Sequence, residues 1–178
     1  MLFLQIFQVL PLFYREAGGL SEAGIGLVLA FNGLIVFGVE MPLVYYIENR
    51  FPLYKLIITG TALCGFSFLV LLMGGHTSVL YLGMFLLSIS EILAMPFMVT
   101  RVVQRAGPEA RGSYLGLYTM SWSLAFIISP FITTYLIEHI GFNALWLFDG
   151  VLALLTVIGF FMLEPRLSVK AATVKDPL

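Results

Sequence analysis

Long apolar runs alternate with short polar connections along this 178-residue chain. Five of the runs reach about 20 residues, the length that an α-helix needs to cross the roughly 30 Å hydrocarbon core of a bilayer. Strands of a membrane barrel would alternate in polarity, and these runs do not. The pattern therefore predicts an all-α, polytopic membrane helix bundle, with spans at residues 24–47, 53–73, 79–99, 115–137 and 144–163.

A sixth run, residues 1–14, is apolar but short. At helical rise its residues reach only about 21 Å, and the run lacks the basic flank and cleavage site of a signal peptide. We interpret it as the second half of a helix, so that residues 1–166 form six transmembrane helices, the first truncated, with both termini on the same side. Residues 167–178 lean polar, and we expect them to form a disordered cytoplasmic tail.

Composition excludes a soluble domain, because 60% of residues are hydrophobic, 11% are charged and the mean hydropathy is +1.01. The positive charges are asymmetric. Arg15 alone lies on the first connection, whereas the other Lys and Arg residues lie on the second and fourth connections and in the tail. The positive-inside rule then places those connections and the C-terminus in the cytoplasm.

Two acids lie within apolar runs, Glu40 and Glu91, each shortly before a Met-Pro pair. An ionisable group inside a bilayer is costly and is by default a hypothesis for a functional site. Such an acid can bind and release a proton, which is what proton coupling requires. The alternative is a structural acid that is hydrogen-bonded to a neighbouring helix. Asp149 is only about 7 Å inside the outer end of its run at helical rise, and we expect it to reach the interface.

Neutral polar groups within apolar stretches are Gln5, Gln8 and Asn32, which could hydrogen-bond a substrate or join helices. An aromatic stripe at i, i+4 spacing follows one helix face. It could be a packing or lipid-facing surface, or an aromatic wall for an amphipathic substrate. Its members are Tyr114, Tyr118, Trp122 and Phe126.

Glycines at close spacing, among them Gly60 and Gly65, predict close approach of helix backbones. Prolines within the runs predict interruptions or kinks, since proline lacks the amide hydrogen that a helix uses. They are Pro11, Pro42, Pro96 and Pro130.

Several function classes find no support in the sequence. There is no nucleotide fingerprint, phosphate-binding loop or nucleophile elbow, so we expect neither an enzyme nor a cofactor. His76 and His139 fall in outer turns without ligand partners, so no metal site is expected. The basic residues flank membrane ends, where topology explains them without nucleic acid.

The connection after the second helix reads Glu48-Asn49-Arg50-Phe51-Pro52-Leu53-Tyr54-Lys55. It resembles a degenerate copy of the loop signature of the major facilitator superfamily. Asn49 stands where that family has an acid, and Glu48 beside it could supply the missing carboxylate. The resemblance implies a cytoplasmic gate formed by Glu48, Asn49, Arg50 and Lys55.

Two further stretches resemble the same family. Pro108-Glu109-Ala110-Arg111-Gly112-Ser113-Tyr114-Leu115-Gly116 is similar to the segment after the tenth helix of many of its permeases, and Ser129-Pro130 stands where many have Gly-Pro in the eleventh. The whole chain therefore resembles the C-terminal six-helix half of a twelve-helix permease. It is most similar to bacterial multidrug-efflux members, which implies a plasma (bacterial inner) membrane location.

In that family two six-helix halves enclose a site at the membrane midplane and expose it alternately to each face. The resemblance implies that the first, second, fourth and fifth helices line this cavity. Its implied partners are the lipid bilayer, a small-molecule substrate, protons and an N-terminal six-helix half, encoded upstream or supplied by a second copy. The cavity candidates on these helices are Gln8, Asn32, Glu40, Glu91, Tyr118, Trp122 and Phe126.

The function that we expect is proton-coupled efflux of lipophilic small molecules by a secondary transporter. Uptake or facilitated diffusion of a metabolite is the alternative within that class. From a different class, the chain could be a small six-helix substrate-binding subunit of an energised importer.

Overall fold

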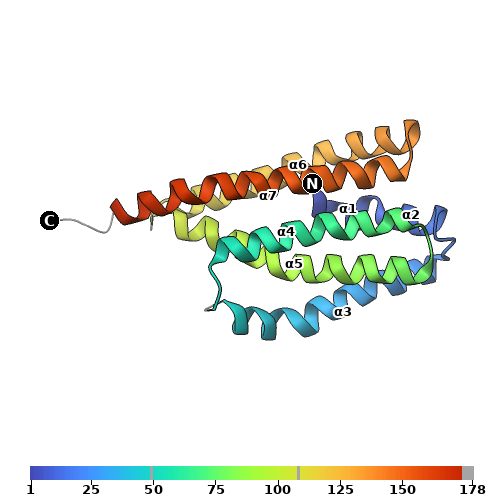
Figure 1. Ribbon diagram of the computed structural model, residues 1–178, viewed down its shortest axis with the longest axis horizontal. Helices are drawn as coiled ribbons and strands as arrows, with labels where there is room; N and C mark the ends of the chain where they lie inside the picture. Colours follow the sequence, from blue (N-terminus) through green and yellow to red (C-terminus); the bar gives the residue numbers. More distant parts are fainter. Residues whose placement is uncertain (49, 108, 174–178) are drawn as a thin grey trace.

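The computed structural model describes residues 1–48, 50–107 and 109–173, with side chains up to residue 163 within these ranges. Every regular element in this part of the chain is a helix, which confirms the all-α class. The helices run lengthwise beside one another (Figure 1). In chain order they are η1 (Leu2–Leu4), α1 (Gln5–Gln8), α2 (Leu10–Glu16), α3 (Glu22–Ile47), α4 (Leu53–Val70), η2 (Leu71–Met73), α5 (Thr77–Arg105), α6 (Arg111–His139) and α7 (Phe142–Thr173).

Five segments in the described part are long and apolar enough to cross a membrane. They coincide with the five full-length runs of the sequence. They are Glu22–Ile47, Leu53–Met73, Thr77–Arg105, Arg111–His139 and Phe142–Leu163.

The helices extend beyond the apolar runs that predicted them. The third full span reaches Arg105 where the sequence predicts an end at residue 99, and α7 continues to Thr173, into the predicted tail. The reason is that hydropathy marks only the part of a helix that suits hydrocarbon, while Arg, Lys and Gln are good helix formers outside it. Residues 174–178 lie outside the described part.

The first run is not one continuous helix. Val9 separates α1 from α2 with φ −124° and ψ −39°, and Pro11 occupies the first turn of α2, where its missing amide hydrogen is tolerated. The predicted interruption at Pro11 is therefore confirmed, and this run is not among the five spans, whereas Pro42, Pro96 and Pro130 lie inside single helices and interrupt none of them. Figure 1 shows the N-terminus beside the middle of the bundle, from where α1 and α2 run toward one end.

Helix α4 lies at the centre of the packing, against α5 on one side and α7 on the other. A Cβ added at Gly60 would lie 2.9 Å from the Cβ of Ala94 on α5. One added at Gly65 would lie 2.5 Å from the Cβ of Ala153 on α7. Only glycine fits at such distances, so the predicted close approach of backbones is confirmed at these two positions.

An aromatic cluster holds α2, α4 and α7 together. The fully buried ring of Trp146 stacks on Phe68, with centroids 5.7 Å apart and an interplanar angle of 5°. Phe13 meets the same indole edge-on, with centroids 5.1 Å apart. Such pairs add stabilisation beyond the area that they bury.

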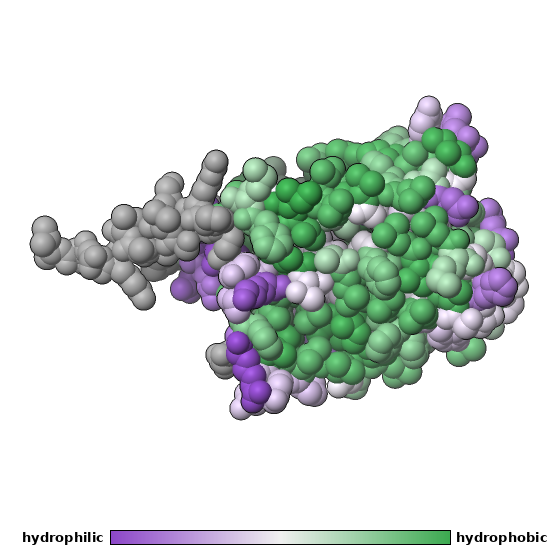
Figure 2. All heavy atoms as spheres, in the orientation of Figure 1, coloured by the Kyte–Doolittle hydropathy of each residue, from purple (hydrophilic) through white to green (hydrophobic). Residues whose placement is uncertain are grey.

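Charged and apolar surfaces are separated along the long axis. In Figure 2 apolar residues cover the middle of the visible face and hydrophilic residues gather at its two ends. The α3–α4 and α5–α6 connections lie at one end of the bundle (Figure 1). We call it the basic end, defined by Arg50, Lys55, Arg101, Arg105 and Arg111.

The opposite end, which we call the Arg15 end, carries the other three connections. Two of them are in contact, because a Cβ added at Gly75 would clash with the carbonyl oxygen of Ala17. A Cβ added at Gly18 would likewise lie 2.7 Å from Cδ1 of Leu80. The turns around residues 17–18 and 75 therefore form one packed unit.

Candidate functional site

Glu40 on α3 and Glu91 on α5 line the same small pocket, of about 140 Å³. Its other walls are the apolar side chains of Val36, Ile92 and Met95. Both glutamates are half-buried. We call this the acidic pocket; it brings together the two acids that the sequence singled out.

Asn32 connects the two helices beside this pocket. Its amide nitrogen lies 2.9 Å from Ser88 Oγ and 3.3 Å from Glu91 Oε2. The Ser88 hydroxyl in turn donates to the carbonyl oxygen of Met84, at 2.8 Å. Of the two roles that the sequence allowed for Asn32, the structure shows helix-to-helix bonding.

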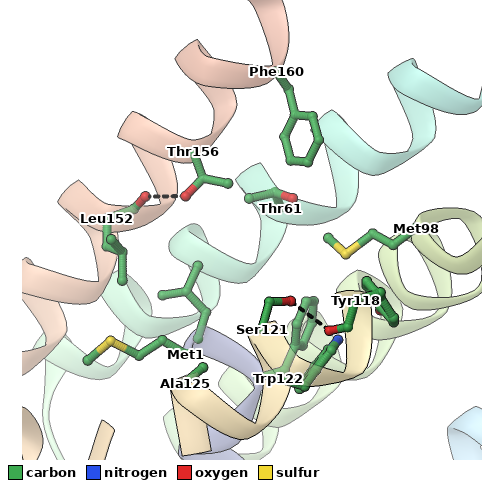
Figure 3. Close-up of a pocket in the computed structure, with 12 residues that line it drawn as sticks. Met1, Thr61, Met98, Tyr118, Ser121, Trp122, Ala125, Leu152, Thr156 and Phe160 are labelled. Carbon is green, nitrogen blue, oxygen red and sulfur yellow. Dashed lines mark hydrogen bonds between the residues drawn. The ribbon is translucent and has the colours of Figure 1, made fainter. Parts of the chain in front are cut away.

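A second pocket, of about 360 Å³, lies between α6 and α7 and reaches α4, α5 and Met1. We call it the aromatic pocket, because Tyr118 and Trp122 project into it from one face of α6 (Figure 3). Their rings meet edge-on with centroids 6.3 Å apart. The remaining labelled side chains of its wall are Thr61, Met98, Ser121, Ala125, Leu152, Thr156 and Phe160.

Two of the hydroxyl groups of this pocket are engaged within their own helices, whereas the buried Thr61 hydroxyl of α4 has no hydrogen-bond partner among the described residues. Ser121 donates to the carbonyl oxygen of Tyr118, and Thr156 donates to that of Leu152, each at 2.7 Å (Figure 3). Such bonds satisfy a hydroxyl donor within its own helix. The pocket therefore presents aromatic and aliphatic surface with few free donors.

A third pocket, of about 640 Å³, adjoins the aromatic pocket and shares Met98, Tyr118, Ser121 and Phe160 with it. It extends toward the basic end, where Arg101 and Arg105 form part of its wall. The two pockets together make a continuous groove between the helices.

The structure does not bring all cavity candidates into one pocket. Phe126, next on the aromatic stripe, is 58% exposed and outside the aromatic pocket lining. Gln8 is half-buried, with its Oε1 atom buried and without a hydrogen-bond partner. Within this chain the acids thus line one pocket and the aromatic side chains another.

At the loop signature, Arg50 contacts an aromatic ring. Its guanidinium carbon lies 3.9 Å from the ring centroid of Tyr46, one helical turn earlier, and Nη1 donates to the Tyr46 hydroxyl at 2.7 Å. Among the described residues Arg50 forms no ion pair. Glu48 and Lys55 are exposed, and Asn49, like Pro108 of the second motif, lies outside the described residues.

Asp149 is not at the interface, as its depth along α7 had suggested, but fully buried. The amide nitrogen of Gln5 on α1 lies 3.3 Å from Asp149 Oδ1. The expectation was wrong because depth does not specify which face of a helix a residue occupies, and this face of α7 lies inside the bundle. Sequence reasoning likewise missed Tyr46 and Ser88 as partners of the candidate residues.

These features define a multi-pass helical membrane protein with acids within its apolar helices and an apolar groove between them. The chain belongs to the Major Facilitator Superfamily, whose family profile matches residues 2–177. This is a family of transporters and not of enzymes, which confirms the expectation that the chain is no enzyme.

Curated relatives are distant and longer. Multidrug resistance protein MdtH of Yersinia pestis (strain Pestoides F) is 27% identical over 124 residues, which cover 70% of this chain and 31% of that protein. A Bacillus subtilis (strain 168) protein named "Uncharacterized MFS-type transporter YhcA" is 23% identical over 147 residues, 75% of this chain and 26% of the relative. The chain thus spans about a quarter to a third of the relatives that it matches. No solved structure matches significantly.

Proposed function

We propose that this chain is the C-terminal six-helix half, its first helix truncated, of a secondary transporter that exchanges protons for lipophilic small molecules by alternating access. Family membership supports the transporter class. The name of the relative MdtH supports efflux of drug-like molecules. The observation that carries the proposal is the acidic pocket, where carboxyl groups from two membrane helices share one small apolar space.

The acidic pocket suits proton binding for an electrostatic reason. Glu40 and Glu91 line a pocket of about 140 Å³, and two like charges so placed repel each other. Binding one proton removes that repulsion. Asn32 donates to Glu91 and fixes its orientation. Alternate exposure of this pocket to the two sides of the membrane would carry the proton across.

The aromatic pocket suits the substrate. Its walls are mainly Tyr118, Trp122 and aliphatic side chains, and the hydroxyls of Ser121 and Thr156 are engaged within their own helices, which leaves that of Thr61 free to orient a ligand. Pockets of this kind recognise ligands through apolar and aromatic contact, with few orienting polar groups. A lipophilic molecule, planar in part, fits such a wall better than a sugar or an amino acid.

The partner half would cover α3 and α6. Few residues of these helices are buried within this chain, and large side chains such as Phe37 and Phe131 are 86% and 76% exposed. An added Cβ would meet no atom within 4 Å at Gly33 and Gly38 on α3 or at Gly112 and Gly116 on α6. Small residues on open helix faces are typical of contacts between membrane helices. We propose an N-terminal six-helix half there, with the basic end and the C-terminus in the cytoplasm.

The test compares Glu40→Gln and Glu91→Gln with the parent in proteoliposomes of the transporter that contains this chain. Glutamine keeps the shape and a hydrogen bond but cannot carry the proton. We expect at least one variant to lose substrate-driven proton flux and its dependence on pH. Glu138→Gln, at an exposed position of α6, is the matched control and should transport normally.

If both variants keep proton flux and its pH dependence, Glu40 and Glu91 are structural acids. The proposed antiport would then be replaced by facilitated diffusion or by coupling elsewhere.

A further inference from the structure

A third acid is buried in the bundle, away from the acidic pocket. Asp149 on α7 and Gln5 on α1 are both fully buried, and they are joined across 144 positions by the bond from Gln5 Nε2 to Asp149 Oδ1, 3.3 Å long. Their other two polar oxygens, Gln5 Oε1 and Asp149 Oδ2, are buried without a hydrogen-bond partner. Both unpartnered atoms thus belong to the same pair.

The chemistry of the pair explains why two atoms are left over. An ionised carboxylate only accepts hydrogen bonds, and an amide oxygen also only accepts. With Asp149 ionised, Oδ2 and Oε1 therefore cannot bond to each other. One proton on Oδ2 supplies the missing donor, and its O–H group can donate to Gln5 Oε1 in the cyclic arrangement of a carboxylic acid with an amide.

The surroundings supply no compensating side-chain cation. Among the described residues Asp149 forms no ion pair. The titratable groups that act on it are the thiol of Cys64 on α4 and the amino group of Met1, the one positive charge among them, which offsets part of the charge of the carboxylate. The thiol is itself fully buried and brings no positive charge. An unpaired buried carboxylate is costly, and taking up a proton removes that cost.

We propose that Asp149 and Gln5 form a proton-binding site separate from Glu40 and Glu91, in which the Oδ2–H group of Asp149 donates to Gln5 Oε1. Release breaks the Oδ2–H bond and passes the proton to water, which leaves a carboxylate that retains only the bond from Gln5 Nε2. The pair then holds α1 on α7 by one hydrogen bond in place of two.

The location of Gln5 gives the site a mechanical consequence, and this part rests on the proposed transport function. Gln5 precedes the break at Val9, so that α1 is joined to α2 at a point where the helix is already interrupted. Loss of the second hydrogen bond would loosen α1 on α7, while α2 stays held there by the contact of Phe13 with Trp146. Protonation of Asp149 therefore strengthens the attachment of α1 to α7, and deprotonation weakens it.

Infrared difference spectroscopy of the intact transporter in lipid tests the site without measuring transport. At neutral pH we expect the carbonyl stretch of an un-ionised carboxylic acid that is lost in Asp149→Asn. In Gln5→Leu the same band should move to higher frequency, because the acid loses its amide partner. Both spectra are recorded in a Glu40→Gln, Glu91→Gln background, so that the acidic pocket contributes no carboxyl band.

The outcomes separate this site from the proposed antiport. A band that is present with Asp149 and absent in Asp149→Asn supports the site even if antiport fails in the Glu40 and Glu91 variants. Identical spectra for parent and Asp149→Asn, or a band unmoved by Gln5→Leu, would overturn it. A band that disappears on adding sodium would overturn it too, in favour of a cation bound between the two oxygens.

A stability measurement covers the case in which a variant folds poorly. The Nδ2–H group of Asp149→Asn can replace the acidic O–H toward Gln5 Oε1, so this variant should melt close to the parent, whereas Asp149→Ala should melt lower. Equal melting of Asp149→Asn and Asp149→Ala would contradict the proposed pairing.

Discussion

Asn32 Nδ2 lies 3.3 Å from Glu91 Oε2 and joins α3 to α5 across 59 positions of sequence. The same amide contacts Ser88, one turn before Glu91, so one side chain holds two positions of α5. Helix α3 has few buried residues, and this contact is a large share of the polar bonding that fixes it to the bundle.

Asn32→Ala should therefore lower the free energy of unfolding by about 1–3 kcal/mol, the usual cost of removing one partner from a buried hydrogen bond. Thermal unfolding in detergent measures it. Thr119→Ala is the control, since that hydroxyl bonds only to the Leu115 carbonyl within α6 and is exposed. An equal loss in both variants would show that the Asn32 contact does not anchor α3.

Gly65→Ala should destabilise the bundle by about 1–3 kcal/mol, because the added methyl group would lie 2.5 Å from the Ala153 Cβ atom. Gly159→Ala, on α7 with no atom within 4 Å, should be neutral or stabilising by up to about 1 kcal/mol, as expected for replacing glycine in a helix. Melting curves of the two variants compare them. If Gly65→Ala melts like Gly159→Ala, α4 and α7 are not in close contact.

Trp122→Ala should weaken binding of a lipophilic substrate roughly tenfold, which corresponds to about 1.4 kcal/mol. The reason is the loss of the largest aromatic surface of the aromatic pocket. Phe126→Ala, one turn further along the same stripe but outside the pocket lining, is the control and should bind as the parent does. Fluorescence titration with a lipophilic dye gives both affinities. Equal effects would assign the stripe to packing or lipid contact.

Arg50→Ala should slow transport while leaving the amount of folded protein unchanged, since Arg50 is exposed and belongs to the proposed cytoplasmic gate. Tyr46→Phe keeps the ring beneath the guanidinium and removes only the hydroxyl acceptor, so it should slow transport less. The measurement is the initial rate of substrate flux in proteoliposomes for each variant and the parent, corrected for the amount of reconstituted protein. Unchanged turnover in Arg50→Ala would remove Arg50 from the gate.

Cysteines introduced at Arg50 and Arg111 should react with a membrane-impermeant maleimide from the same side, and one at His76 from the other. The α3–α4 and α5–α6 connections lie at one end of the bundle, and His76 lies in the α4–α5 turn at the opposite end. The native Cys64 is fully buried and should stay unlabelled. Labelling of positions 50 and 111 from opposite sides would contradict this arrangement.

The spans and the choice of Glu40 and Glu91 as candidate acids could be made from sequence, because each follows from a local rule. Twenty apolar residues predict a membrane helix, and an acid within such a run predicts an interior position. This rule singles out Glu40 and Glu91, which lie on different helices. In the structure the two side chains line one pocket.

The direction in which a residue points around its helix axis could not be anticipated from sequence. Asp149 was expected at the interface from its depth alone, but the fold turns it toward α1, where Gln5 donates to it. Tyr118 and Trp122 line the aromatic pocket while Phe126, on the same stripe, is exposed. Both outcomes depend on how neighbouring helices pack, which no spacing within one helix records.

The packed unit at the Arg15 end gives the bundle a fulcrum. Because the turn at Gly75 packs against that at Ala17, α5 is braced on α2 and α4 at that end, whereas toward the basic end a pocket of about 640 Å³ lies between α5 and the helices α6 and α7. Helices braced at one end and separated at the other behave as levers, whose displacement grows with distance from the pivot. The widest excursions of this bundle should therefore occur beside Arg101 and Arg105.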